Sequence, residues 1–396
     1  INKKNVNKLS AAWMHQPGKI KMGLQVTPIA MDGIVYYTGS YNIVFAVDGY
    51  SGEQLWKYTH EFTELGDRGI EFGWDEKSLF FTPYSRGLAV GNKAVYIGTL
   101  DGQAVALDKN TGEVLWKSKV VDTARCNCNF TSGPVVAGDV IIFGPAGSEL
   151  FAKGAIYGLS ADSGEILWEF ETLRDHPDSW LPEHRSTGGG FGWMPGQYDP
   201  ETDTVLWGIG NPAPDWDDGD DRPGDNLYTS GIVALASKTG QLKWYHQQVP
   251  HDVWDMDASG EFIYTERDGQ RLISNLNKNG YIYVYHRDDG KLRNVWKLSQ
   301  SANWAEGVDE KTGEIINPLI PPPGEEVNIC PWVGGVRGWG AGSYNPKTGL
   351  WYTMAQDYCL LTEVVEGAER VEGAVGMNAM MTAAFPPGKQ YPPRLV

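Results

Sequence analysis

The sequence predicts an all-β fold, a β-propeller built from repeated four-stranded units. Three observations predict it. A hairpin pattern recurs along the chain, 49 glycines and 23 prolines occur among 396 residues, and no long stretch has the 3.6-residue period of a helix. Glycine and proline at this level are typical of many short strands joined by turns.

The recurring unit is a short apolar strand, then Ala-x-Asp or a relative, two residues, Thr/Ser-Gly, three residues and Trp. The Asp-x-x-Thr-Gly segment predicts a turn, because glycine adopts the positive φ that other residues resist. Flanking apolar segments such as 34–40 and 94–100 predict strands. The units end at Trp56, Trp116, Trp168, Trp244, Trp296 and Trp351, and a related element ends at Trp207.

The spacing of these tryptophans predicts about one unit per blade. Successive units end 60, 52, 76, 52 and 55 residues apart, which suits four strands each. Regular Trp positions would let each blade dock on the next. The alternative is a series of unrelated hairpins that contain Trp, and six occurrences argue against it. We therefore expect tryptophan-docking repeats with about six to seven blades' worth of sequence, in a single domain over 1–396.

Composition excludes several classes of protein. The net charge of −17 argues against a general nucleic-acid binder, since phosphate binding needs a basic face. A hydrophobic fraction of 41% is too high for disorder, and no apolar run approaches the roughly 18 residues of a membrane span. The start at Ile1, without an initiator Met, suggests a processed chain. None of the four cysteines lies in a CxxC or CxxCH motif, which argues against zinc and covalently attached haem.

Acids and amides occur in three unusual loops. Glu149 follows an apolar strand, Asn211 directly follows VLWGIG, and Asp255 and Asp257 lie in PHDVWDMD after the hairpin that ends at Trp244. If HDVWDMD is extended, both of its last acids point to one face. Oxygens from different blades that meet near the propeller axis would form a hard-cation site of the calcium type. The simpler interpretation is separate, solvated acids at strand ends.

The repeats, together with GNPAP at 210–214, RPGDNLYTS at 222–230 and PHDVWDMD at 250–257, resemble the quinoprotein dehydrogenases. This family includes methanol, other alcohol and membrane glucose dehydrogenases. Its members are eight-bladed propellers with pyrroloquinoline quinone (PQQ) and a metal ion on the axis. The resemblance runs over nearly the whole chain. It implies an enzyme that oxidises an alcohol or sugar hydroxyl and passes electrons to a cytochrome c or a similar acceptor. Separately, the acidic charge, the even number of cysteines and the processed start favour an exported protein, periplasmic or extracellular.

The resemblance also implies a metal site. Glu149 and Asn211 stand where the family binds its metal ion. Asp255 stands at the position of the candidate general base, and Asp257 where lanthanide-using alcohol dehydrogenases carry an additional metal-binding Asp. The implied ligand set is therefore these four residues, with Ca²⁺ or a lanthanide ion.

Five further residues match family contacts to PQQ. Trp193 in GGGFGW corresponds to the floor under the quinone, and Arg86 to an Arg that pairs with a PQQ carboxylate. Thr131 matches a hydroxyl donor, Lys278 a cation beside the quinone oxygens, and Gln25 a Glu or Gln contact. The plainer interpretations are a surface Arg and Lys, a turn Thr and a core Trp. All five occur in family order, which favours the functional interpretation.

Several positions depart from the family. Adjacent cysteines usually precede the Arg86 segment, but here 78–87 has none. Cys126 and Cys128 lie before Thr131 instead, as a disulfide or as two thiols, whereas Cys330 and Cys359 resemble a structural bridge of the family. Other departures are Gly338 in place of a quinone-contacting Asn, and a chain that stops about two blades early.

An acidic run and four aromatic residues allow two further expectations. The acidic run at 215–221 lacks the order of an EF-hand, so we expect a solvated loop. Candidate pocket walls are Phe80, Phe81, Trp332 and Trp339, for which burial in the core is the alternative.

Two other functions are compatible with the sequence. A cofactor-free propeller could serve as a scaffold or binding module, because a fold does not fix a function. A calcium-dependent glycoside-acting propeller would need a carboxylate pair, which only Asp255 and Asp257 suggest. The residues leave the substrate open, and they are compatible with a homodimer.

Overall fold

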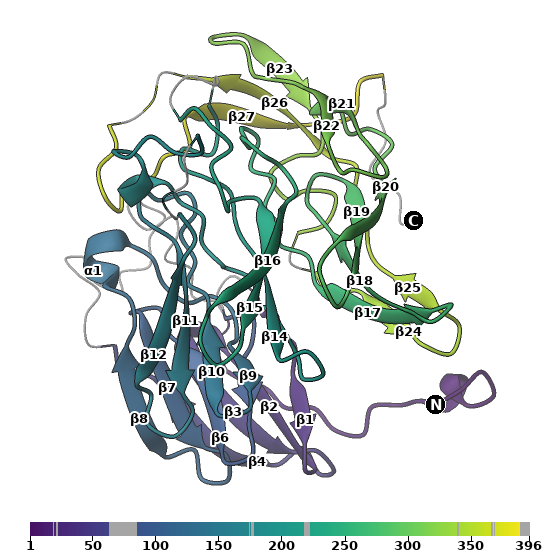
Figure 1. Cartoon of the computed structure of the whole chain (residues 1–396). Coiled ribbons are helices and arrows are strands. Elements are labelled where there is room, and N and C mark those ends of the chain that lie inside the picture. Colours follow the sequence, from purple (N-terminus) through teal and green to yellow (C-terminus); the bar gives the residue numbers. More distant parts are fainter. Residues whose placement is uncertain are drawn as a thin grey trace.

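The chain is almost entirely β-structure in the computed structural model (Figure 1), which describes residues 1–18, 20, 23–62, 85–173, 175, 178–217, 222–338, 340–365, 367 and 369–388. Within those residues the helical elements are short. The α-helix α1 covers Thr123–Cys126, and the 3₁₀ turns η1, η2 and η3 cover Val6–Lys8, Ser40–Asn42 and Arg185–Thr187. The expected all-β class is therefore confirmed.

Five four-stranded antiparallel sheets form most of the molecule, each from four strands consecutive in the chain. They are β1 (Ile29–Met31), β2 (Ile34–Thr38), β3 (Ile43–Asp48) and β4 (Gln54–Thr59); β5 (Ala89–Val90), β6 (Ala94–Gly98), β7 (Gln103–Asp108) and β8 (Val114–Lys119); β9 (Val135–Ala137), β10 (Val140–Phe143), β11 (Ala155–Ser160) and β12 (Ile166–Glu171); β13 (Gln197–Asp199), β14 (Thr204–Gly208), β15 (Gly231–Ala236) and β16 (Leu242–Gln247); and β17 (Phe262–Arg267), β18 (Gln270–Leu276), β19 (Tyr281–His286) and β20 (Leu292–Lys297).

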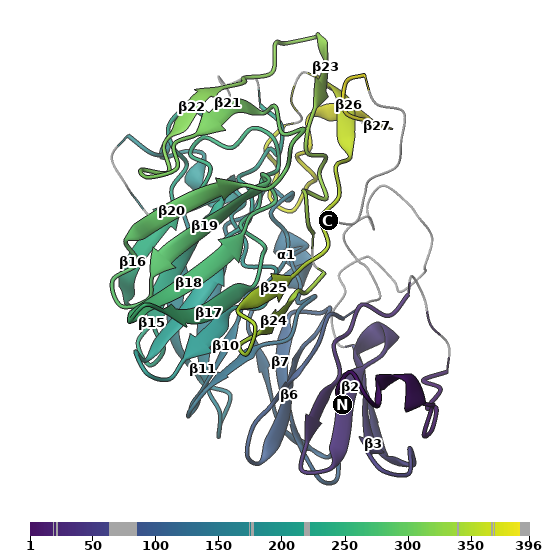
Figure 2. The same cartoon turned by 90° about the vertical axis from the view of Figure 1, so that its right-hand side faces the viewer.

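The sheets follow one another as propeller blades do. The first strands of successive sheets are neighbours, with β1 beside β5, β5 beside β9 and β9 beside β13. Figure 2 shows the progression from the purple first sheet to the green fifth sheet. Apolar side chains from facing sheets fill the space between them; one such cluster contains Val140, Phe170, Val205 and Val233 from the third and fourth sheets. The predicted propeller type is confirmed.

A tryptophan on the fourth strand docks each blade on the next. Trp168 on β12 donates from its indole Nε1 to the carbonyl of Ser237 at 3.0 Å. Its ring also covers Gly240 of the next hairpin turn, where φ is +66° and a Cβ would lie 2.5 Å from the ring. Larger residues are excluded there by both conformation and space. The same arrangement joins Trp56 to Lys109 and Gly112, and Trp116 to Ala161 and Gly164.

The tryptophans of the repeat pattern lie at two different strand positions, the fourth strand or the second strand of a sheet. Trp296 also lies on a fourth strand, but it is 51% exposed, since no further four-stranded sheet follows it in the described part of the chain. Trp207 and Trp351 instead lie on second strands, β14 and β25 (Leu350–Tyr352). The described residues therefore contain five complete blades, although the repeat pattern occurs more often.

Residues 305–384 form three smaller sheets. These are β21 (Ala305–Val308) with β22 (Ile315–Pro318); β23 (Glu326–Ile329) with β26 (Cys359–Val364) and β27 (Ala379–Ala384); and β24 (Ser343–Asn345) with β25. Both views place β24 and β25 beside the fifth sheet (Figures 1 and 2).

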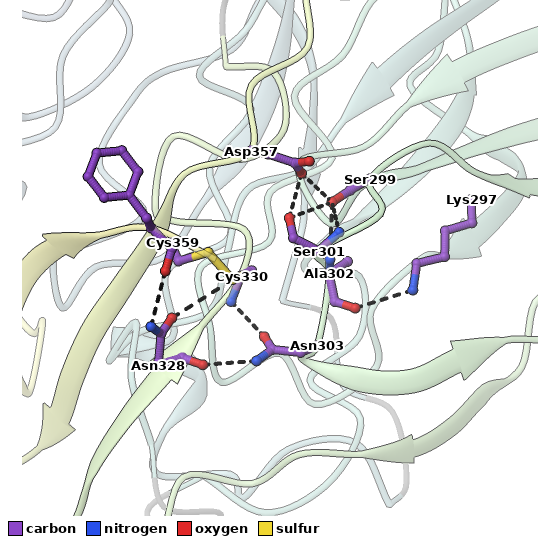
Figure 3. Close-up of a disulfide and its surroundings, with 10 residues drawn as sticks. Lys297, Ser299, Ser301, Ala302, Asn303, Asn328, Cys330, Asp357 and Cys359 are labelled. Carbon is purple, nitrogen blue, oxygen red and sulfur yellow. Dashed lines mark hydrogen bonds between the residues drawn. A yellow bond between two sulfur atoms is a disulfide. The ribbon is translucent and has the colours of Figure 1, made fainter. Parts of the chain in front are cut away.

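A disulfide crosslinks two segments within residues 305–384, and hydrogen bonds connect this region to the loop after β20. Cys330 and Cys359 are bonded, as the resemblance implied. Figure 3 shows that Asn303 accepts a hydrogen bond from the Cys330 amide, while Asp357 accepts hydrogen bonds from two serines. Cys126 and Cys128 also form a disulfide, which settles the choice between a bond and two thiols.

Candidate functional site

The candidate residues come from loops at one end of the blades. In an antiparallel hairpin the first strand begins where the second strand ends, so loops at these two points lie together. Each candidate from Arg86 onward occupies one of these two points. They are Arg86 before β5, Thr131 before β9, Trp193 before β13, Asp255 and Asp257 before β17, Glu149 after β10, Asn211 after β14 and Lys278 after β18.

Three of the predicted cofactor residues are in contact. The guanidinium of Arg86 donates to Thr131 Oγ1 at 2.7 Å and lies 5.0 Å from the centre of the Trp193 ring. The Arg86 amide also donates to the Thr131 carbonyl at 2.7 Å. Ser132, next in the chain, donates to the Trp193 carbonyl. The result is a positive charge beside a flat aromatic face, an arrangement suited to a planar anionic ligand.

A second group surrounds Lys278. Its ammonium lies 2.7 Å from Asp255 Oδ1 and 2.7 Å from Asp257 Oδ2, with all three side chains almost completely buried. It also donates to the Asp255 carbonyl at 3.2 Å. Although burial alone would lower the pKa of Lys278, the two carboxylates raise it above the ordinary value. The ammonium therefore stays charged, bound to both acids.

The loop that carries these acids is not extended, which corrects the expected reason for their convergence. Asp255 has a φ of +59°, in the left-handed region, and the loop precedes a first strand instead of following a second one. Asp252 holds the turn, because its carboxylate accepts from the amides of Trp254 and Met256 at 2.9 and 2.7 Å. Both acids still reach one point, through a local turn and not through strand alternation.

Asn211 is fixed beside them. Its amide N–H donates to Asp257 Oδ1 at 2.7 Å, and its side-chain Nδ2 donates to Asp215 Oδ1 at 2.7 Å. Its side-chain oxygen, Oδ1, is buried and has no hydrogen-bond partner among the described residues. A buried carbonyl oxygen without a donor is costly, so this atom is expected to meet a cation or another donor.

The loop with Glu149 packs on the same group. Ser148 Oγ accepts from the Phe191 amide at 3.0 Å, and a Cβ on Gly210 would lie 2.8 Å from Asp257 Oδ1. The loops can approach this closely because position 210 has no side chain. Burial raises the pKa of Glu149, and the negative charge of Asp257 adds to that shift.

The site is electrostatically dense. Burial raises the pKa of Asp255 well above its ordinary value; Asp257 and Glu149 raise it further, against the opposing effect of Lys278. Burial and the other three carboxylates likewise raise the pKa of Asp215. The four acids Glu149, Asp215, Asp255 and Asp257 together form a region of strong negative potential, which a cation would relieve.

The donor set fits a hard cation shared with an ammonium. Among the residues that the structure describes, no three His, Cys, Asp or Glu side chains alone meet at metal-binding distances. The ammonium of Lys278 binds two of the three candidate carboxylates, those of Asp255 and Asp257. The ammonium itself marks the place as one that stabilises positive charge, and Asn211 Oδ1 is an additional oxygen without a partner.

Some predicted residues are not joined to this group. Gln25 precedes β1 and is half-buried, and its Oε1 has no hydrogen-bond partner in the described chain. Trp332 packs against Tyr358, with 5.7 Å between ring centres, as part of the core around the fifth sheet. Phe80, Phe81 and Trp339 lie outside the described residues.

The acidic run at 215–221 was expected to be a solvated loop, and residues 215–217 correct this because they are buried, while 218–221 lie outside the described residues. Asp215 and Asp217 are 1% and 2% exposed. Asp217 accepts a hydrogen bond from the amide of Arg222, whose buried guanidinium also binds Asn226. The acidic composition of the run favoured a solvated loop. The partners of the two acids are instead Arg222 of the RPGDN segment and Asn211. The Arg of the RPGDN segment was the available signal for buried acids, because a buried guanidinium requires acceptors around it. Asp215 and Asp252 were not among the predicted site residues.

The fold and the site together define a β-propeller protein with a buried, strongly charged site at one end of its blades. The family model described as "PQQ: Glucose/ethanol/alcohol dehydrogenase, beta-propeller domain" matches residues 1–302. The chain therefore belongs to the PQQ-dependent quinoprotein dehydrogenase family, as its motifs suggested.

Individual relatives support this assignment. Quinoprotein alcohol dehydrogenase PedH of Pseudomonas putida is 33% identical in an alignment of 390 residues that covers 90% of this chain and 63% of that protein. A quinoprotein ethanol dehydrogenase of Pseudomonas putida is 31% identical in an alignment of 411 residues that covers 90% of this chain and 64% of that protein. A solved europium-containing methanol dehydrogenase matches with a TM-score of 0.86 and 26% identity, over 97% of this chain and 70% of that one. The chain thus spans less than two thirds of the length of these two curated relatives.

In the described residues no helix has the length and apolar character needed to cross a membrane.

Proposed function

We propose that this protein is a PQQ- and metal-dependent dehydrogenase that oxidises an alcohol or sugar hydroxyl to a carbonyl. The observation that carries the proposal is the buried group around Lys278, in which one ammonium binds Asp255 and Asp257 beside an Asn211 oxygen without a partner. Structural repeats alone do not need such a group, and its residues lie at the positions that the family motifs nominate. A cofactor-free scaffold would have no use for it.

The residues around Arg86 would hold the cofactor. PQQ is planar and carries carboxylates, so the Trp193 face suits its rings and the Arg86 guanidinium suits a carboxylate. Thr131 already binds Arg86 and orients it. Gln25 would add a contact through its Oε1, which is buried without a partner in the described chain. Lys278 would face the quinone oxygens.

Glu149, Asn211, Asp255 and Asp257 would hold the metal ion, either Ca²⁺ or a lanthanide. All four offer oxygen donors, which both ions prefer. When bound, PQQ supplies the hydride acceptor and the metal ion supplies Lewis-acid polarisation of its carbonyl. The europium ion named for the solved methanol dehydrogenase belongs to that protein, and it supports a lanthanide as one of the two choices here.

Asp255 would act as the general base. Its carboxylate would accept the proton of the substrate hydroxyl, and bound PQQ would supply the acceptor for the hydride of the carbon. The environment raises the pKa of Asp255, which makes the carboxylate a stronger base than a free one. Lys278 donates to Oδ1 of the same carboxylate, holding it in place and compensating its charge before the proton arrives.

Electrons would pass to a cytochrome c or a similar acceptor, the partner that the resemblance to the quinoprotein dehydrogenases implies. The two disulfides favour an oxidising compartment, and we propose the periplasm.

The test is dye-linked oxidation of alcohols and aldoses by the purified chain, after addition of PQQ with Ca²⁺ or La³⁺. Wild type should be active with one of the two ions. Asp255→Asn should lose roughly 100-fold or more in kcat, on the scale of general-base catalysis. The matched control is Asp268→Asn, at a side chain 91% exposed, which should keep full activity. Full activity of Asp255→Asn would refute the base assignment. Absence of both PQQ binding and stoichiometric metal in wild type would favour the scaffold.

A further inference from the structure

We propose that Asp215 is a positioning residue that orients the side-chain amide of Asn211, so that its oxygen faces the metal ion. The inference rests on the proposed metal site and assigns a role to a residue outside the four expected ligands. It arises from the pattern of donors and acceptors around one buried amide.

Both hydrogens of the Asn211 amide are already occupied. Nδ2 donates to Asp215 Oδ1 at 2.7 Å and to the Pro212 carbonyl at 3.1 Å. The amide oxygen has no hydrogen-bond partner among the described residues, and the whole side chain is 0% exposed. An amide with a satisfied NH₂ and a free oxygen has one preferred orientation.

The opposite orientation would be unfavourable because of Asp215. A flipped Asn211 would place its oxygen against the Asp215 carboxylate, so that two acceptors would face each other. It would also lose the 2.7 Å hydrogen bond from Asn211 Nδ2 to Asp215 Oδ1. The NH₂ group would then point toward the metal position, where it cannot act as a ligand. Asp215 thus discriminates between an oxygen and a nitrogen at the site.

Asp215 is itself held in place from both sides. Its amide donates to the Gly376 carbonyl at 2.9 Å, and the Gly376 amide donates to the Glu149 carbonyl at 2.8 Å. The adjacent Trp216 forms an isolated antiparallel bridge with Trp254, next to Asp255. These backbone contacts fix the position of Asp215 relative to the loops of Glu149 and Asp255. Its carboxylate could therefore move only if those loops moved with it.

The experiment measures Eu³⁺ bound to the full chain without PQQ. Luminescence decay in H₂O and D₂O reports how many waters the ion keeps, and titration gives its affinity. Asp215→Leu removes the acceptor, so Asn211 can flip and a water should replace its oxygen. We expect about one additional water and about 10- to 100-fold weaker binding, the usual effect of losing a partner that orients a ligand.

Two further variants separate orientation from charge and from misfolding. Asp215→Asn offers both an oxygen acceptor and an NH₂ donor at nearly the same shape, so it can pair with either orientation of Asn211, and the water count should lie between those of wild type and Asp215→Leu. Asn211→Ala should gain the same water as Asp215→Leu. Adding Asp215→Leu to Asn211→Ala should change the count no further, because Asp215 acts through Asn211.

The outcomes are distinguishable. Equal water counts for Asp215→Leu and wild type would overturn the proposal, as would the same gain in Asp215→Asn. An extra water in the double variant beyond that of Asn211→Ala would mean that Asp215 binds the ion directly, which also overturns it. If wild type binds no Eu³⁺, both this inference and the metal site fail, whereas dye-linked activity with PQQ tests the dehydrogenase function separately.

Discussion

The ammonium of Lys278 binds Asp257 Oδ2 at 2.7 Å in an almost completely buried position. The other oxygen of this carboxylate, Oδ1, accepts a hydrogen bond from the backbone N–H of Asn211. Asp257 therefore contacts both the ammonium of Lys278 and the backbone of Asn211, whose side-chain oxygen is a proposed metal ligand. A metal ion that binds Asp257 must share the acid with Lys278.

This sharing predicts the behaviour of Lys278→Met. Removing the ammonium leaves Asp255 and Asp257 without their buried partner, so the metal-free protein should lose about 3–5 kcal/mol of unfolding free energy. Metal affinity should rise, because a competing charge is gone, while dehydrogenase activity should fall at least about tenfold, as expected for loss of one site donor. Chemical denaturation and Eu³⁺ titration check the first two results. Lys291→Met, at a residue 78% exposed, is the control. Weaker Eu³⁺ binding by Lys278→Met would contradict the competition.

Arg86→Lys should bind PQQ about tenfold more weakly, because Lys cannot both stack on Trp193 and donate as a planar fork. The charge is retained, so the loss would report geometry. Quenching of tryptophan fluorescence by PQQ gives the affinity. Arg267→Lys, at a side chain 84% exposed, should bind as wild type does. Equal affinity of Arg86→Lys and wild type would remove Arg86 from the cofactor site.

Blade docking predicts a contrast between two tryptophans at equivalent strand positions. Trp168→Ala should cost about 3–5 kcal/mol of unfolding free energy, since it empties a buried site and removes the bond to Ser237. Trp296→Ala should cost less than about 1 kcal/mol, because this ring is 51% exposed. Urea denaturation of both variants measures the difference. Similar costs would show that the repeat tryptophans stabilise their own blade and not the junction.

His246 predicts a pH dependence of stability. Burial lowers its pKa from 6.5 to about 4, and its ring packs against Tyr283 and Tyr285. Between pH 6.5 and pH 4, His246 binds a proton in the unfolded chain but not in the folded one. Its contribution to the free energy of unfolding is therefore fully present above pH 6.5 and is lost as the pH falls toward 4. The contribution changes by up to about 1.4 kcal/mol per pH unit. In His246→Phe, denaturation curves from pH 7 to 4 should have a shallower slope than in wild type. An unchanged slope would exclude His246 as its source.

The sequence predicted features that depend on local pattern, and it failed where partners are distant. Repeats, turns and the docking of Trp168 could be predicted because each unit carries its own signal. Asp255 and Asp257 were expected to converge and they do, but the cause is a left-handed turn braced by Asp252, which strand alternation could not reveal. Asp215 resembled a solvated acid because its partners, Asn211 and Gly376, are set by tertiary structure. Composition cannot report such contacts.

The link through Gly376 also constrains the order in which the site can be assembled. Gly376 connects the backbone of Glu149 to that of Asp215, and it enters the chain after all five complete blades. During synthesis, the strands of those blades emerge from the ribosome before the residue that ties two of their loops together. The blades can therefore fold before the loops of Glu149 and Asp215 are tied together through Gly376.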